Sequence, residues 1–135
     1  MKKVLLIVIA FLLLGSSAFF IRAESAGAKY YVSYDTVVTQ NKPGVVYFYS
    51  KTCRYCTQIA PIIDELRQEF KYVYNFAKLD VDDRRNTEIC NKNRVWTIPA
   101  IYLYNPKAKT LKPIPPYYFS KENLREILSK FATKV

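Results

Sequence analysis

The chain has 135 residues, of which half are apolar and 24% are charged, with 21 Lys and Arg against 11 Asp and Glu. These proportions are typical of one folded domain and exclude disordered and collagen-like chains. The sequence contains no histidine. This excludes Ser-His-Asp and Cys-His catalysis and zinc held by histidine. It also excludes covalent c-type haem, because Thr57 follows the C-x-x-C pair. The reactive groups that remain are those of cysteine, carboxylates, lysine and tyrosine.

The first 28 residues predict an export segment that is separate from the fold. Lys2 and Lys3 precede an uninterrupted apolar run at 4–14, and small residues follow at 15–18. This order is typical of a secretory signal peptide, with cleavage after residue 18, 23 or 28. Residues 29–135 then form the mature domain.

The alternative for the same segment is an uncleaved membrane anchor. Residues 4–21 are close to the lower limit of about 17–25 residues for a spanning helix, and the lysines at 2 and 3 would stay on the cytoplasmic side. Both interpretations place the domain outside the cytoplasm. We therefore expect a periplasmic or otherwise extracytoplasmic protein, either secreted or tethered to the membrane.

From residue 30 onward the apolar pattern predicts alternating strands and helices. The expected elements, in chain order, are a short strand at 30–32, a helical turn at 35–41, a buried central strand at 45–49, an amphipathic helix at 53–70, a strand at 74–81, a short helix at 86–93, a hairpin of strands at 100–104 and 111–114, and a last helix that Ser120 caps. A mixed sheet between two layers of helices buries the apolar faces of this α/β order.

Prolines modify two of these elements. Pro61 lies inside the 53–70 helix, whose apolar pattern resumes at once, so we expect a kink and not an end. Pro113 places the 111–114 strand at an edge of the sheet, because proline donates no backbone hydrogen bond to a neighbouring strand.

The positive charge does not indicate a nucleic-acid partner. The formal net charge is +10, but the basic residues are scattered, and Arg84-Arg85 is the only adjacent basic pair after the export segment. No glycine-rich or aromatic RNA-binding motif accompanies that pair. We expect a solvated surface with at most weak attraction to anionic lipid or acidic partners.

The chemistry is predicted at Cys53-Arg54-Tyr55-Cys56. The first cysteine falls after a buried strand and at the start of a helix, where free backbone N–H groups and the helix dipole stabilise a thiolate. Arg54 adds a neighbouring positive charge. Cys56 lies one turn further, where it is suited to attack a mixed disulfide at Cys53 and release the product. The pattern favours a redox-active disulfide and requires no cofactor.

Other interpretations of the cysteines remain open at this stage. The pair is alternatively a static disulfide, or half of a zinc site completed by Cys90 and a carboxylate, although that ligand set is unusual. It is also compatible with a copper(I) carrier or with an adaptor without turnover, but no methionine or histidine near the pair supports copper. For Cys90 itself we expect a buried, inert thiol, with a mixed disulfide or a dimer link as the alternative.

Several spaced segments resemble the thioredoxin family over about residues 30–133. They are the active-site helix at 53–66 with Pro61, the strand at 77–82, Thr97-Ile98-Pro99 and the start of the last helix at 120–124. The resemblance implies a thioredoxin fold and thiol–disulfide exchange, with Cys53 as nucleophile and Cys56 as resolving cysteine. It also implies that Ile98 and Pro99 form a cis-proline loop that faces the cysteines and holds the substrate chain.

The departures from the family pattern carry further information. Tyr47 stands where thioredoxins usually carry a buried acid that moves the proton of the resolving cysteine, whereas the usual lysine partner is retained as Lys78. Thr52 replaces the usual tryptophan before the first cysteine. The combination Thr52-Cys53-x-Tyr55-Cys56 is similar to that of periplasmic disulfide isomerases, whose dimerisation domain is absent here. We therefore expect Arg54, Tyr47 and Lys78 to tune the thiolate.

Aromatic residues replace small or lost groups around the expected substrate groove. Tyr117 stands where the family has a glycine, and Tyr55 and Trp96 are candidates for the aromatic surface lost at position 52. Packing in the core is the alternative role, because aromatic side chains bury well. The sequence thus predicts a monomeric, extracytoplasmic thiol–disulfide oxidoreductase of protein thiols and disulfides, reset by a membrane electron-transfer partner.

Overall fold

The computed structural model describes residues 31–135, whose strands form one mixed sheet. The strands are β1 (Gly44–Tyr49), β2 (Asn75–Asp80), β3 (Ala100–Asn105) and β4 (Thr110–Ile114), in the order β2-β1-β3-β4. Strand β1 is parallel to β2 and antiparallel to β3, and β4 pairs antiparallel with β3. The predicted mixed sheet and the edge position of the strand with Pro113 are confirmed.

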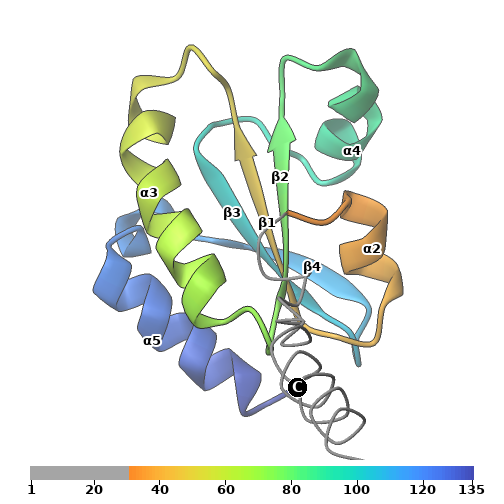
Figure 1. Ribbon diagram of the computed structural model, residues 1–135. Coiled ribbons are helices and arrows are strands. Elements are labelled where there is room, and N and C mark those ends of the chain that lie inside the picture. The colour runs from red at the N-terminus through yellow and green to blue at the C-terminus, as the bar shows by residue number, and fades with distance from the viewer. Residues whose placement is uncertain (1–30) are drawn as a thin grey trace, which may run out of the picture.

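Helices cover both faces of this sheet (Figure 1). Helices α3 (Arg54–Glu69) and α5 (Lys121–Ala132) lie on one face, and α2 (Tyr34–Thr39) and α4 (Thr87–Lys92) lie on the other. Short 3₁₀ turns, η2 (Arg84–Asn86) and η3 (Pro116–Tyr118), precede α4 and α5. Helix α3 continues through Pro61, and the side chain of Ser120 caps α5 by accepting the N–H of Asn123 at 3.2 Å.

The core has two halves because strand side chains alternate between the faces of a sheet. Val45 and Tyr47 of β1 point to the α3 and α5 side, where they pack with Ile63, Leu66, Leu124 and Leu128. Val46 and Phe48 point to the α2 and α4 side, where they pack with Val37 and Leu79. All four β1 side chains are at most 2% exposed, so β1 is the buried central strand that the apolar run predicts.

The expected strand at 30–32 is wrong at residue 31, which forms no strand, whereas residue 30 lies outside the described residues. Within the described residues it amounts to one isolated bridge, between Val32 and Ala77. The next residue, Ser33, caps α2 by accepting the N–H of Thr36 at 3.1 Å, so the chain leaves the sheet directly after this bridge. The bounds of the other elements agree with the sequence pattern to within two residues.

The predicted signal or anchor at 1–28 lies outside the described residues. Among residues 31–135, no helix has both the length and the apolar character needed to cross a bilayer.

We expect Gly44→Ala to destabilise the fold by about 1–3 kcal/mol, the usual cost of overpacking a core. A Cβ at Gly44 would overlap the Cγ1 methyl of Val37, which is fully buried. Urea denaturation of the oxidised protein measures this loss.

The matched control is the Val37→Ala background, in which the overlapping methyl is absent. Gly44→Ala should cost less there than in the natural sequence. Equal costs in the two backgrounds would show that contact with Val37 is not the cause.

Candidate active site

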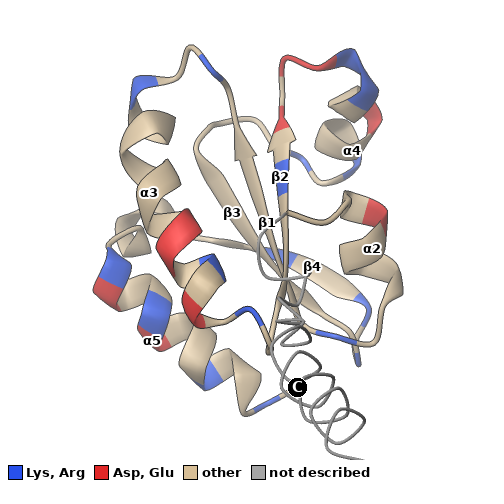
Figure 2. Ribbon diagram, viewed as in Figure 1, with Lys and Arg blue, Asp and Glu red and all other residues tan. Residues whose placement is uncertain are grey.

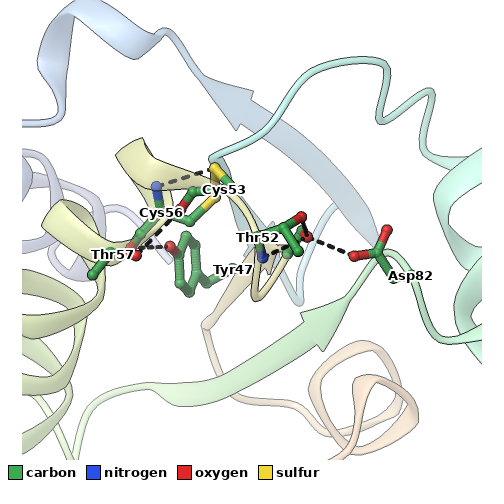
Figure 3. The surroundings of a disulfide bond; sticks show 7 residues. Tyr47, Thr52, Cys53, Cys56, Thr57 and Asp82 are labelled. Carbon is green, nitrogen blue, oxygen red and sulfur yellow. Dashed lines mark hydrogen bonds between the residues drawn. A yellow bond between two sulfur atoms is a disulfide. The ribbon is translucent and has the colours of Figure 1, made fainter.

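Strand β1 delivers the two cysteines to the beginning of α3. The chain leaves β1 at Ser50, turns, and reaches Cys53, which is the N-cap of α3 and whose sulfur accepts the N–H of Cys56 at 3.1 Å. Cys53 and Cys56 are joined by a disulfide, with their Cα atoms 5.2 Å apart (Figure 3). The sequence prediction of a pair at a helix start is confirmed.

The two sulfur-bearing residues differ in exposure. Cys56 is only 3% exposed and belongs to the core under α3, whereas Cys53 is partly exposed at the protein surface. A partner thiol therefore has access to Cys53 and not to Cys56. This asymmetry is the geometry that disulfide exchange requires, because one sulfur must form the mixed disulfide with the partner while the other remains shielded until it resolves that disulfide.

The electrostatic surroundings favour negative charge on Cys53. The first turn of α3 holds no acidic residue, and Arg54 is exposed beside the cysteine. Figure 2 shows basic residues in blue, and none in red, on the turn that leads into α3. The N–H that Cys56 directs at the sulfur, together with the positive end of a 16-residue helix, stabilises a thiolate at this position.

A polar network holds the turn in front of Cys53 (Figure 3). The hydroxyl of Ser50 donates to Asp82 at 2.5 Å and lies 2.9 Å from the hydroxyl of Thr52. The same hydroxyl accepts the N–H of Thr52 at 3.2 Å, and the Ser50 carbonyl accepts the N–H of Cys53 at 3.3 Å. Sequence reasoning did not identify Ser50 or Asp82. The available signal was that β1 and β2 are both followed by polar residues and end at the same edge of a parallel pair.

Tyr47 lies directly beneath the cysteines. Its ring is fully buried, and its hydroxyl donates to the carbonyl oxygen of Cys56 at 3.0 Å. Burial, followed by the charges of Tyr49 and Asp64, raises the pKa of Tyr47 to about 12. The residue that replaces the family's buried acid is therefore neutral at physiological pH and is anchored to the backbone of the resolving cysteine.

Lys78 lies among aromatic rings. Its ammonium is 4.6 Å from the ring centroid of Tyr49, 5.7 Å from that of Tyr31 and 5.9 Å from that of Tyr47. A cation within about 6 Å of a ring face is attracted by the ring quadrupole. The ammonium of Lys78 is therefore closest to Tyr49, with the Tyr47 ring at the limit of this range.

The loop before β3 carries the predicted cis-proline. The Ile98–Pro99 peptide bond is cis, as expected. Ile98 packs against the same core cluster as Cys53, and in Figure 3 the segment that leads into β3 runs past the sulfur of Cys53. Trp96, in the same loop, is 76% exposed, and Tyr55 is 71% exposed. These two aromatic side chains therefore face solvent and do not fill the core.

Two further sequence candidates lie elsewhere. Tyr117 is exposed and tilted against Tyr118, with ring centroids 4.4 Å apart. Cys90, on α4, is a free thiol that is partly buried and packs against the core cluster on the α2 and α4 side, so the expectation of a buried thiol is met only in part. The reason is that α4 is a short helix with no fully buried residue. Burial nevertheless raises the pKa of the Cys90 thiol.

The described residues bring together no group of three His, Cys, Asp or Glu side chains that would hold a metal ion. The disulfide is the redox group of the site.

Comparisons with known proteins agree on one family. The family model described as thioredoxin matches residues 28–129. The chain is 31% identical over 81 residues to thioredoxin-1 of Saccharomyces cerevisiae, a match that covers 60% of this chain and 76% of that protein. It is 35% identical over 68 residues to a bifunctional thioredoxin reductase/thioredoxin of Mycobacterium leprae, covering half of this chain and 14% of that protein.

A solved structure shows the same fold. A mutant thioredoxin from Halobacterium salinarum superposes with a TM-score of 0.64 at 20% identity, covering 76% of this chain and 88% of that one.

The buried tyrosines should make stability fall at alkaline pH. Burial is the largest cause of the raised pKa of Tyr31, Tyr47 and Tyr74. It raises the pKa of Tyr47 from 10.0 to about 12 and raises the pKa of the other two tyrosines further still. The unfolded chain loses these protons near pH 10 while the folded chain keeps them. The stability is therefore complete below pH 10 and is lost as the pH rises from 10 towards 12.

Urea midpoints measured between pH 8 and 11 test this expectation. Tyr47→Phe should reduce the slope above pH 10, whereas Tyr72→Phe, which changes an exposed tyrosine, should leave it unchanged. A slope for Tyr47→Phe equal to that of the natural protein would contradict the assignment.

Proposed function

The chain belongs to the thioredoxin family and is a thiol–disulfide oxidoreductase, and from this premise we propose that it exchanges disulfides with protein substrates outside the cytoplasm. The location is supported by the residues before the domain: two lysines, an apolar run at 4–14 and small residues at 15–18. A secreted chain and a chain tethered through residues 4–21 both satisfy this proposal.

The reaction proceeds through one mixed disulfide. In the reduced protein the Cys53 thiolate attacks a substrate disulfide, forms a bond to one substrate sulfur and releases the other as a thiolate. Cys56, as thiolate, then attacks the Cys53 sulfur, which closes the disulfide seen in the structure and releases the reduced substrate. The reverse sequence oxidises a substrate dithiol. A membrane electron-transfer partner is proposed to reset the pair.

The single observation that carries the proposal is the unequal placement of the two sulfurs. Cys53 is the partly exposed N-cap that accepts a backbone N–H, while Cys56 is buried behind it. We propose that the incoming substrate chain lies along the loop with Ile98 and Pro99, which packs against the same core cluster as Cys53, and contacts Tyr55 and Trp96. The exposed rings of Tyr55 and Trp96 offer it apolar area.

Cys56→Ser should trap a mixed disulfide with substrate through Cys53, because the second attack is removed while the exposed, activated thiolate remains. Cys53→Ser should trap nothing, since Cys56 is out of reach of a partner. Non-reducing gels of both variants, expressed as the full chain, measure the trapped fraction. Equal trapping by the two variants would reverse or abolish the assignment of roles.

The redox potential should lie above that of a strongly reducing thioredoxin, about −270 mV, and closer to the isomerase value of about −180 mV. The helix N-terminus, the N–H of Cys56 and Arg54 all stabilise the Cys53 thiolate, and so favour the dithiol over the disulfide. Neutral Tyr47 adds no negative charge that would oppose it. Equilibration with glutathione buffers measures the potential.

Arg54→Gly tests the charge contribution. Because Arg54 is exposed, screening by solvent and salt limits its effect, and we expect the variant to be more reducing by at most about 30 mV. Arg84→Gly, which removes an exposed charge outside the site, is the control and should leave the potential unchanged. A redox potential of the natural protein at or below the thioredoxin value of about −270 mV would show that the protein is a dedicated reductant.

A further inference from the structure

The end of the sheet opposite the disulfide carries lysines and no acidic residue. Gly44, at the start of β1, pairs with Asn75 at the start of β2 and with Tyr104 near the end of β3. The segments at 40–43, 70–74 and 105–110 therefore meet at this end. Together they contain no Asp or Glu, and they contain four lysines: Lys42, Lys71, Lys107 and Lys109. We name these lysines, together with Tyr72 and Val73, the basal face.

Within the described part of the chain, none of these lysines forms an ion pair with a carboxylate. Within residues 31–135, the ion pairs lie elsewhere, for example between Arg125 and Glu69 and between Lys130 and Glu126 on the flank formed by α3 and α5. Lys107 and Lys109 are exposed, and the Nζ of Lys42 lies 3.5 Å from the carbonyl oxygen of Lys71. Figure 2 shows blue segments and no red ones along the hairpin turn between β3 and β4.

The basal face also exposes apolar and aromatic area. Tyr72 is 74% exposed and Val73 is 41% exposed, and the ammonium of Lys71 lies 5.0 Å from the ring centroid of Tyr72. Tyrosine and lysine often occur together on protein surfaces that contact a bilayer, because the tyrosine ring lies at the level of the headgroups and the lysine ammonium binds their phosphates.

The backbone enters the described fold from this same end. Val32 pairs in parallel with Ala77, so Tyr31 lies towards the start of β2. Nine residues, 22–30, separate Tyr31 from the predicted apolar segment at 4–21. The ten steps from residue 21 to Tyr31, at about 3.3–3.6 Å each, reach no more than roughly 36 Å, which keeps the domain near a membrane that holds that segment.

We infer that the basal face docks on the surface of an anionic phospholipid bilayer. Its lysines meet the negative headgroups, and Tyr72 and Val73 enter the interfacial layer. Because Cys53 follows the other end of β1, docking holds the disulfide at the end of the domain that faces away from the lipid surface. The inference rests on the tethered form of the proposed extracytoplasmic protein and does not depend on the thiol chemistry. The result of its test is therefore independent of the result of the trapping experiment that tests the oxidoreductase role.

The protein's single tryptophan allows a direct test. The full chain is incorporated into vesicles of phosphatidylcholine, with or without phosphatidylglycerol, whose acyl chains are brominated to quench nearby tryptophan. Tyr72→Trp combined with Trp96→Phe reports on the basal face, and the natural Trp96 reports on the disulfide end. We expect quenching of the tryptophan at 72 only with phosphatidylglycerol and only at low salt, and no quenching of Trp96 in any vesicle.

Charge variants identify the lysines responsible. Each lysine at an anionic surface contributes a factor of about five, so Lys71→Gln, Lys107→Gln and Lys109→Gln together should weaken domain docking by roughly 100-fold. The matched control removes three exposed charges outside the basal face: Arg84→Gln, Lys92→Gln and Arg94→Gln. It should dock like the natural chain.

Three results would overturn the inference. They are an unquenched tryptophan at 72 in anionic vesicles, quenching that is equal in vesicles without phosphatidylglycerol, and equal losses in the two triple variants. The first would leave an acidic protein as the better candidate partner of the basal face.

Discussion

The pairing of the central strand β1 with a neighbouring strand on each side is the constraint on which the rest of the structure depends. Parallel pairing with β2 and antiparallel pairing with β3 fix which β1 residues face which helices. A register slip of one residue would move every side chain to the other face. Tyr47 would then leave the carbonyl of Cys56, and Val46 would take its place under α3. The burial of residues 44–48 in β1 thus supports both the core and the site.

The position of Cys53 depends on a contact between segments far apart in the sequence. Asp82, after β2, accepts the hydroxyl of Ser50, after β1, and Ser50 in turn holds the backbone of the turn before the cysteine. Parallel strands bring these two segments to the same edge of the sheet. Ser50 is 5% exposed, so its hydroxyl is buried and requires these partners. The reactive sulfur is therefore positioned by sheet geometry as much as by its own helix.

The parts of this molecule that follow from local pattern were predictable, and those that follow from long-range contacts were not. The apolar run at 45–49 and the spacing of Ile59, Ile62 and Ile63 predicted β1 and α3, and C-x-x-C at their junction predicted the disulfide. Partners distant in sequence, such as Ser50 with Asp82 and Tyr31 with Asp64, leave no periodic signal. Within the described residues, the strand expected at 30–32 is limited to the bridge at Val32.

The exchange of a buried acid for Tyr47 has consequences for Lys78 as well as for the cysteines. A carboxylate at this position would need a cation to offset the cost of burial. The phenol needs none, because its hydroxyl is satisfied by the Cys56 carbonyl. Lys78 is instead attracted to the rings of Tyr31, Tyr47 and Tyr49, so its positive charge stays on the Tyr47 side of the core without a counter-charge at position 47. No carboxylate at position 47 therefore repels negative charge on the cysteines. Tyrosine in place of the acid removes an internal proton acceptor and, for this reason, also favours the thiolate.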